Sequence, residues 1–173
     1  MAGHPKHPAT VHFPIAFTML TGGLDALYFA STSPATAGIV ASAFKTLDIQ
    51  IPLALLPTLS YYSTILTLVT AIPAIVTGAM EFMPVVQRNG FSSKKAQTGA
   101  LHALINDITI FGAAYNWWSR RNEAAFTPST TNLVLSAAIV PVSAFAAYLG
   151  GNLIYKHGMG VGKGSGSKQK KSQ

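Results

Sequence analysis

Four histidines near the ends of apolar segments are the residues of this chain whose chemistry is most informative. His7 and His12 precede or open the first apolar segment, His102 opens the third, and His157 follows the fourth. Imidazole is the commonest protein ligand for haem iron and for transition metals. If the chain crosses a membrane four times, all four side chains lie near the same leaflet. The sequence therefore predicts a histidine-lined site on that side.

The composition favours a membrane protein. Hydrophobic residues make up 49% of the 173 residues and charged residues only 10%, whereas a soluble domain normally carries about 25% charged residues. The net charge of +7 comes largely from lysines in the last eleven residues and from basic residues that flank apolar runs. Such residues contact lipid headgroups and set topology, so we expect no nucleic-acid partner. The absence of cysteine excludes disulfides, cysteine-ligated clusters and covalently attached c-type haem.

Four apolar segments, at about 12–30, 59–83, 100–118 and 133–155, each have the ~20 residues that a membrane-spanning helix needs. We therefore predict an all-α integral membrane four-helix bundle. The segment between the first two spans has apolar residues at helical spacing and predicts an interfacial amphipathic helix. The expected domains are an N-terminal segment (1–11), a four-span membrane domain (12–157) and a flexible basic tail (158–173). No internal repeat is evident.

Small and aromatic residues indicate how these spans are packed and placed. Ser143, Ala147 and Gly151 recur every four residues on the fourth span, a spacing that allows close helix contacts in lipid. Tyr115, Trp117 and Trp118 close the third span directly before Arg120 and Arg121, as expected for an interfacial aromatic belt and its basic anchors. Lysines and arginines are concentrated on the side of the two termini, which predicts that both termini are cytosolic or matrix-side.

With this topology, His12, Glu81, His102 and His157 mark the four helix ends on the termini side. His102 is the strongest single candidate, because it lies just inside a span and shares its helix face with Asn106. Asp107 is rotated away from that face. Asp25 lies thirteen residues after His12, about 20 Å along a helix. It belongs near the opposite leaflet, where an acid must be paired, protonated or in a wet cavity.

The stretches HPATVHFPIAF, ALHALIND and GGNLIYKHGMGV resemble the four-helix membrane family catalogued as domain of unknown function 2231. The resemblance covers about residues 7–161. In that family an acidic residue, usually aspartate, follows a glycine near the end of the second span, and here TGAME supplies Glu81. The resemblance implies the four-span topology and the importance of His7, His12, His102 and His157. It implies no reaction.

Three functional hypotheses follow. A b-type haem for electron transfer needs two imidazoles on facing helices, and His12 with His102, or His102 with His157, would supply them. A redox protein would then be the expected partner. A zinc, copper or iron ion would instead take His12, Glu81, His102 and His157. In the third hypothesis these side chains only join helices of a structural or assembly protein without a cofactor. No motif of a soluble enzyme is present, and the sequence does not decide whether the protein has an enzymatic role. The expected surroundings are the lipid bilayer, in which the chain could also form a homo-oligomer.

Overall fold

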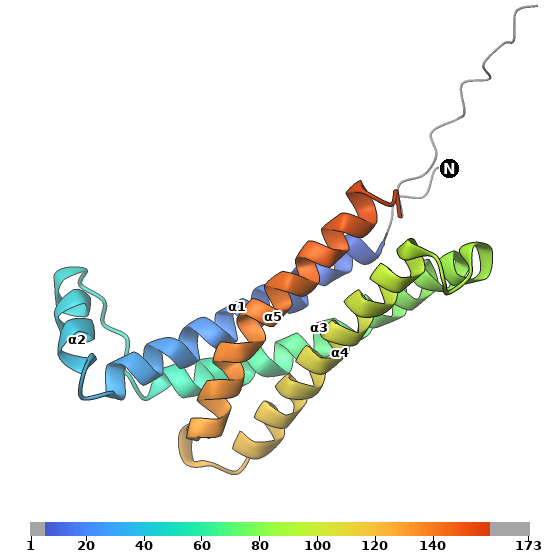
Figure 1. Cartoon of the computed structure of the whole chain (residues 1–173). Helices are drawn as coiled ribbons and strands as arrows, with labels where there is room; N and C mark the ends of the chain where they lie inside the picture. Colours follow the sequence, from blue (N-terminus) through green and yellow to red (C-terminus); the bar gives the residue numbers. More distant parts are fainter. Residues whose placement is uncertain (1–5, 160–173) are drawn as a thin grey trace, which may run out of the picture.

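The computed structural model describes residues 6–159 and contains only helices in this part of the chain. Five α-helices and one 3-10 helix follow one another: α1 (His7–Thr32), α2 (Ala37–Thr46), α3 (Leu55–Asn89), α4 (Lys94–Arg120), η1 (Ala124–Phe126) and α5 (Thr130–Tyr155) (Figure 1). The predicted all-α class is confirmed. Most of the predicted basic tail, residues 160–173, lies outside the described residues.

The four long helices α1, α3, α4 and α5 pack side by side in alternating directions (Figure 1). α1 packs against α3 and α5, and α4 packs against the same two helices, so α1 and α4 face each other diagonally. We call the end that holds the start of α1, the connection between α3 and α4, and the end of α5 the termini end. α2 and η1 lie at the opposite end, the α2 end (Figure 1).

The interior of this helical core contains many polar side chains beside small and apolar ones such as Ala71 and Leu56, whereas its exterior is apolar. The side chains buried between the helices include Thr21, Asp25, Ser60, Ser63, Thr64, Thr67, Thr109, Asn116, Arg120, Asn132, Ser136 and Ser143. Large apolar side chains are exposed along every long helix, among them Phe13 (61%), Ile72 (62%), Phe111 (74%) and Val134 (64%). Exposing so many apolar side chains to water is unfavourable, whereas contact with lipid is favourable. The arrangement therefore indicates a membrane protein.

Three segments are long and apolar enough to cross a membrane: His7–Thr32, Leu55–Asn89 and Ala124–Tyr155. α4 is also long enough, with 27 residues, but its two N-terminal lysines, Asp107 and Arg120 make it less apolar. The structure thus supports three of the four predicted spans by length and composition alone. The crossing by α4 is taken up below as a proposal.

Local signals explain where the long helices begin. α1 starts at His7, five residues before the predicted span, because Pro8 is compatible with the first helical turn, where its missing N–H is not needed. Ser93 caps α4 by accepting the N–H of Ala96, and Ser129 forms a capping box with Asn132 at the start of α5. The predicted N-terminal segment, residues 1–11, therefore contains the first turn of α1.

α2 differs from the long helices because none of its residues is buried. It packs against α1 at the end of the helical core. Ile39 is 70% exposed, and Leu47, just after the helix, is 68% exposed. This position at the end of the helical core is where the membrane interface would lie. The interfacial role of this segment stays a prediction.

Candidate functional site

His7 and His102 meet inside the helical core near the termini end. Their ring centroids lie 6.1 Å apart and their planes are nearly perpendicular, at 87°. Both side chains are half-buried. His7 comes from the first turn of α1 and His102 from the third turn of α4, so the two imidazoles reach each other from diagonally opposed helices.

Each imidazole is fixed to a neighbouring helix in the same way. Nδ1 of His7 donates to the carbonyl oxygen of Ala74 at 2.9 Å, and Nδ1 of His102 donates to that of Ala146 at 2.8 Å. A glycine follows each carbonyl by four residues. A Cβ at Gly78 would lie 2.9 Å from Cε1 of His7, and a Cβ at Gly150 would lie 3.1 Å from Cε1 of His102. The absence of a side chain at these two glycines therefore leaves room for both rings to lie close to the helix backbone.

The two Nδ1 hydrogen bonds determine which ring nitrogen is free. A carbonyl oxygen only accepts, so Nδ1 must carry the proton, and in a neutral imidazole Nε2 then keeps its lone pair. This is the tautomer that binds a metal through Nε2 while the other nitrogen is held by a backbone carbonyl. Nδ2 of Asn106 lies at similar distances from both ring nitrogens of His102, 3.4 and 3.3 Å. Its better bond is the 2.8 Å donation to the His102 carbonyl.

Glu81, a ligand in the metal hypothesis, lies beside the start of α1 and accepts hydrogen bonds from its backbone. Its Oε1 accepts the backbone N–H of Lys6 at 2.8 Å and that of His7 at 2.9 Å. A carboxylate at this place satisfies free N–H groups at the start of α1 and interacts favourably with the helix dipole. Thr10 and Thr77 add a hydroxyl–hydroxyl bond of 2.9 Å one turn further in. Glu81 thus fixes the backbone from which His7 projects.

A second polar cluster lies near the α2 end, where Asp25 and Arg120 form a buried ion pair. Nη1 of Arg120 is 3.3 Å from both carboxylate oxygens, and the two residues are 1% and 0% exposed. Ser60 and Ser136 each donate a hydroxyl to the carboxylate. The guanidinium also donates to the carbonyls of Pro57 and Phe126. Of the three settings expected for Asp25, the structure shows the paired one, and the partner is Arg120, which the sequence analysis had assigned to the membrane interface.

The interfacial anchor predicted at Arg120 is therefore wrong. The side chain points into the helical core because it is 0% exposed and makes all its hydrogen bonds there. Arg121, by contrast, lies over the exposed ring of Trp118 by a cation–π contact, as expected for a surface anchor.

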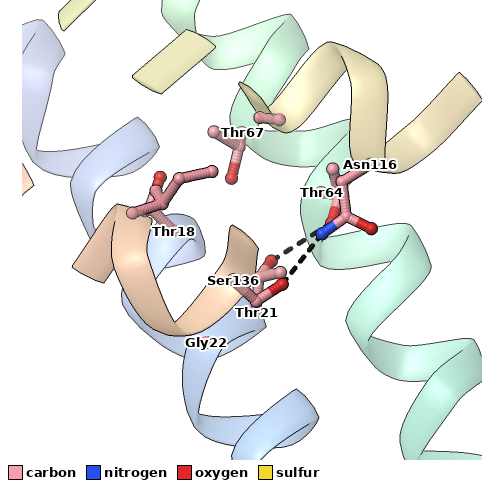
Figure 2. A pocket seen from close by; sticks show the side chains of 9 residues that line it. Thr18, Thr21, Gly22, Thr64, Thr67, Asn116 and Ser136 are labelled. Atoms are coloured by element: carbon pink, nitrogen blue, oxygen red, sulfur yellow. Dashed lines mark hydrogen bonds between the residues drawn. The ribbon is translucent and has the colours of Figure 1, made fainter. Parts of the chain in front are cut away.

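Between these two clusters the helical core contains a small cavity, lined by polar side chains together with Gly22, Ala113 and Ile139 (Figure 2). Hydroxyl and amide groups from all four long helices line it: Thr18, Thr21, Thr64, Thr67, Asn116 and Ser136. Asn116 donates to Ser136 at 2.8 Å, and the hydroxyls of Thr21 and Thr64 are 3.4 Å apart. The cavity volume of about 20 Å³ suffices for a water molecule. Polar groups therefore continue from the histidine level to the ion pair.

The structure also reveals an internal repeat that the sequence did not make evident. The first hairpin consists of α1 and α3, and the second of α4 and α5. Asp25 lies eighteen residues after His7, and Arg120 lies eighteen residues after His102. His7 meets its counterpart His102, and Asp25 meets its counterpart Arg120. Residues that meet their own counterparts lie on a pseudo-two-fold axis, which here runs along the helices.

The second helices of the hairpins follow the same register. Counting back 4, 7, 11, 14 and 18 residues from the glycine that contacts each histidine gives a buried position every time. In α3 these positions are Ala74, Ala71, Thr67, Thr64 and Ser60, and in α5 they are Ala146, Ser143, Ile139, Ser136 and Asn132. Parallel repeats of this kind, related by an axis along the membrane normal, are common in membrane proteins.

The remaining predicted site residues are not brought together. His12 and Asp107 are exposed, and His157 is half-buried at the end of α5. Within residues 6–159, no three histidine, aspartate or glutamate side chains lie close enough to hold a metal ion. The structure therefore joins His7, rather than His12 or His157, with His102. The small residues predicted to pack on the fourth span are only partly correct, since Ser143 is buried while Ala147 is exposed and no side chain approaches Gly151.

Comparison with known proteins gives one match. The family model described as predicted membrane protein (DUF2231) matches residues 3–163. No curated protein and no solved structure matches the chain. The match spans both hairpins and every residue of the two polar clusters.

Proposed function

The chain belongs to the DUF2231 family of predicted membrane proteins, and we propose that it binds one b-type haem between His7 and His102 for one-electron transfer. In this proposal all four long helices cross the membrane, α4 included, since α4 packs in register with three apolar helices and exposes Leu104, Ile108 and Phe111. The haem would lie near the termini end, on the cytosolic or matrix side.

The geometry of the two imidazoles carries this proposal. With metal–nitrogen bonds of about 2 Å, two imidazoles on opposite sides of one metal place their ring centroids about 6 Å apart. The observed centroid separation of 6.1 Å matches this distance, and the spectroscopic test below decides whether both Nε2 atoms bind one iron. Both Nδ1 atoms are held by backbone carbonyls, which leaves Nε2 of each ring as the nitrogen available to iron.

The number of available ligands favours haem over a bare ion. A zinc or copper ion needs three or four protein ligands, and residues 6–159 contain no such group. Haem iron needs only two axial ligands, because the porphyrin supplies four nitrogens. The pseudo-two-fold axis supports the same choice, since each hairpin offers one imidazole in an equivalent setting to one face of a planar ligand.

The chain's own residues would hold and orient this group. Gly78 and Gly150 leave the imidazoles close to the helix backbones, and Glu81 fixes the turn that carries His7. When bound, haem would supply a reversible one-electron couple. Only one imidazole pair is present among the described residues, so electrons would enter and leave on the termini side, through a redox protein at that surface.

The test is a reduced-minus-oxidised absorption spectrum of the detergent-purified full chain, expressed with haem supplementation. We expect a stoichiometric b-type spectrum that is lost in His7→Ala and in His102→Ala. His12→Ala is the matched control, because His12 lies on the same helix as His7 but is exposed. A spectrum that survives both axial substitutions, or depends on His12 instead, would contradict the proposal.

One observation also supports a purely structural role. The Nδ1 bonds of the two histidines join α1 to α3 and α4 to α5, so they would stabilise the helical core without a cofactor. Melting temperatures of the same variants separate the two hypotheses. If the purified protein takes up no haem and His7→Ala and His102→Ala both lower the melting temperature while His12→Ala does not, the histidines join helices only.

A further inference from the structure

His12 and Asp107 are counterparts in the internal repeat and share an unusual setting. His12 lies five residues after His7, and Asp107 lies five residues after His102. Both are therefore about 7.5 Å further along their helices than the axial histidines, at the same depth in the protein. Both are exposed, and neither side chain has a hydrogen bond or ion pair to any residue from 6 to 159.

The surroundings of both side chains are apolar and partly small. Phe13 is exposed beside His12, and Leu104 and Ile108 are exposed near Asp107. Ala9 and Ala16 flank His12 on the exposed face of α1, and Ala103 lies one turn before Asp107 on α4. Small residues on a lipid-facing helix surface allow another helix to approach closely.

A carboxylate in the middle of a 27-residue helix is costly if it faces lipid. Ionisable side chains within membranes almost always face protein or water and are paired with a partner. The pseudo-two-fold axis places His12 and Asp107 on opposite outer faces of the protein, so they cannot pair within one chain. A pairing partner for either side chain would therefore come from another molecule.

We propose that the partner is a second copy of this chain, with the α1 face of one copy against the α4 face of the next and His12 hydrogen-bonded to Asp107. Imidazole, neutral or charged, donates a hydrogen bond to a carboxylate. The repeat puts donor and acceptor at equal depth, so neighbouring copies in the same orientation bring them together without a vertical shift. Contacts between two different faces are heterologous and produce rings or rows of copies.

The charges distinguish this contact from a symmetric dimer. A two-fold contact through α4 would place the Asp107 carboxylates against each other, and one through α1 would pair two imidazoles. No basic side chain of the described residues other than His12 lies at the depth of Asp107 on an exposed helix face. The inference uses the proposed fourth crossing but not the haem, so its test is independent of haem binding.

The absence of cysteine makes a cross-linking test direct. Ala9→Cys and Ala103→Cys keep His12 and Asp107 and place thiols at similar depths on the two faces. Two differently tagged full-length chains, one with each substitution, would be co-expressed, kept in native membranes and oxidised. We expect a disulfide between the two tags and little cross-linking when either variant is expressed alone, since disulfides need Cα atoms within about 7 Å.

A charge exchange tests the pair itself. His12→Asp added to both chains should reduce the mixed cross-link about tenfold, because it places two acids against each other. Adding Asp107→His as well recreates the pair with its members exchanged and should restore cross-linking. The proposal is overturned if Ala9→Cys or Ala103→Cys cross-links mainly with itself, if no cross-link forms, or if the exchanged pair does not restore it. Haem content would be measured in parallel and should not change with Ala103→Cys.

Discussion

Removal of the charge on Asp25 should destabilise the protein more than any other single change to a carboxylate. Asp25→Asn preserves the shape of the side chain but leaves the guanidinium of Arg120 without a counter-ion. The pair is 1% and 0% exposed, so neither water nor lipid headgroups can replace the lost charge. The two serines that donate to the carboxylate would also lose part of their interaction.

The structure allows the magnitude to be stated. Breaking a buried ion pair by removing one partner costs about 3–5 kcal/mol, because the remaining charge stays buried. Removing both charges costs less, so Asp25→Asn combined with Arg120→Gln should recover at least about 2 kcal/mol of the sum of the single changes. Asp48→Asn is the matched control, because Asp48 is exposed and contacts only Gln50, and it should change stability by less than about 0.5 kcal/mol.

Reversible unfolding of the purified protein in mixed micelles, followed by circular dichroism as denaturing detergent increases, gives the free energy of unfolding of each variant. The double-mutant cycle then isolates the Asp25–Arg120 interaction. A loss below about 1 kcal/mol for Asp25→Asn, or additive effects in the double variant, would refute the reasoning that this pair holds the α2 end of the helical core together.

Two further predictions concern the histidine level and the topology. Gly150→Val should lower stability by about 1–3 kcal/mol and displace His102, since even a Cβ at this position would lie 3.1 Å from the His102 ring. Gly151→Val is the control and should be tolerated, because a Cβ there would have no neighbour within 4 Å. Equal losses of stability in melting measurements would contradict the observed contact. Ser92→Cys and Glu123→Cys should react with a membrane-impermeant maleimide from opposite sides of sealed vesicles if α4 crosses the membrane, and labelling of both from one side would exclude that crossing.

Much of the fold could be predicted from the sequence. The low content of charged residues and the four apolar segments indicated long helices in a membrane, and alternating directions followed because consecutive membrane crossings run in opposite directions. The expected level of the histidines also followed, because helix ends on one side must lie together. The helices are longer than predicted because hydropathy identifies the apolar stretch, while capping groups such as Ser93 and Glu81 determine where a helix begins.

The partners within the site could not be predicted in the same way. His7 was placed before the first span because the apolar run starts at about residue 12. Pro8 is compatible with a first helical turn, and α1 begins at His7. Arg120 was assigned to the interface because Trp118 and Arg121 are typical interfacial residues. One signal was available: the eighteen-residue spacing from His102 to Arg120 equals that from His7 to Asp25.

The repeat is concealed in the sequence because only its interior positions are constrained, and their chemistry differs between the two hairpins. Asp25 corresponds to Arg120, since two charged groups that meet at an axis must be complementary rather than identical. Ser60 corresponds to Asn132, and each bonds to different neighbours. The exterior positions face lipid, which accepts almost any apolar side chain. The histidine positions differ from this pattern. Both equivalent positions carry histidine, and both imidazoles make the same hydrogen bond to a backbone carbonyl and the same contact with a glycine. Helix packing alone would not require two identical groups on the axis, whereas a ligand with two equivalent faces would.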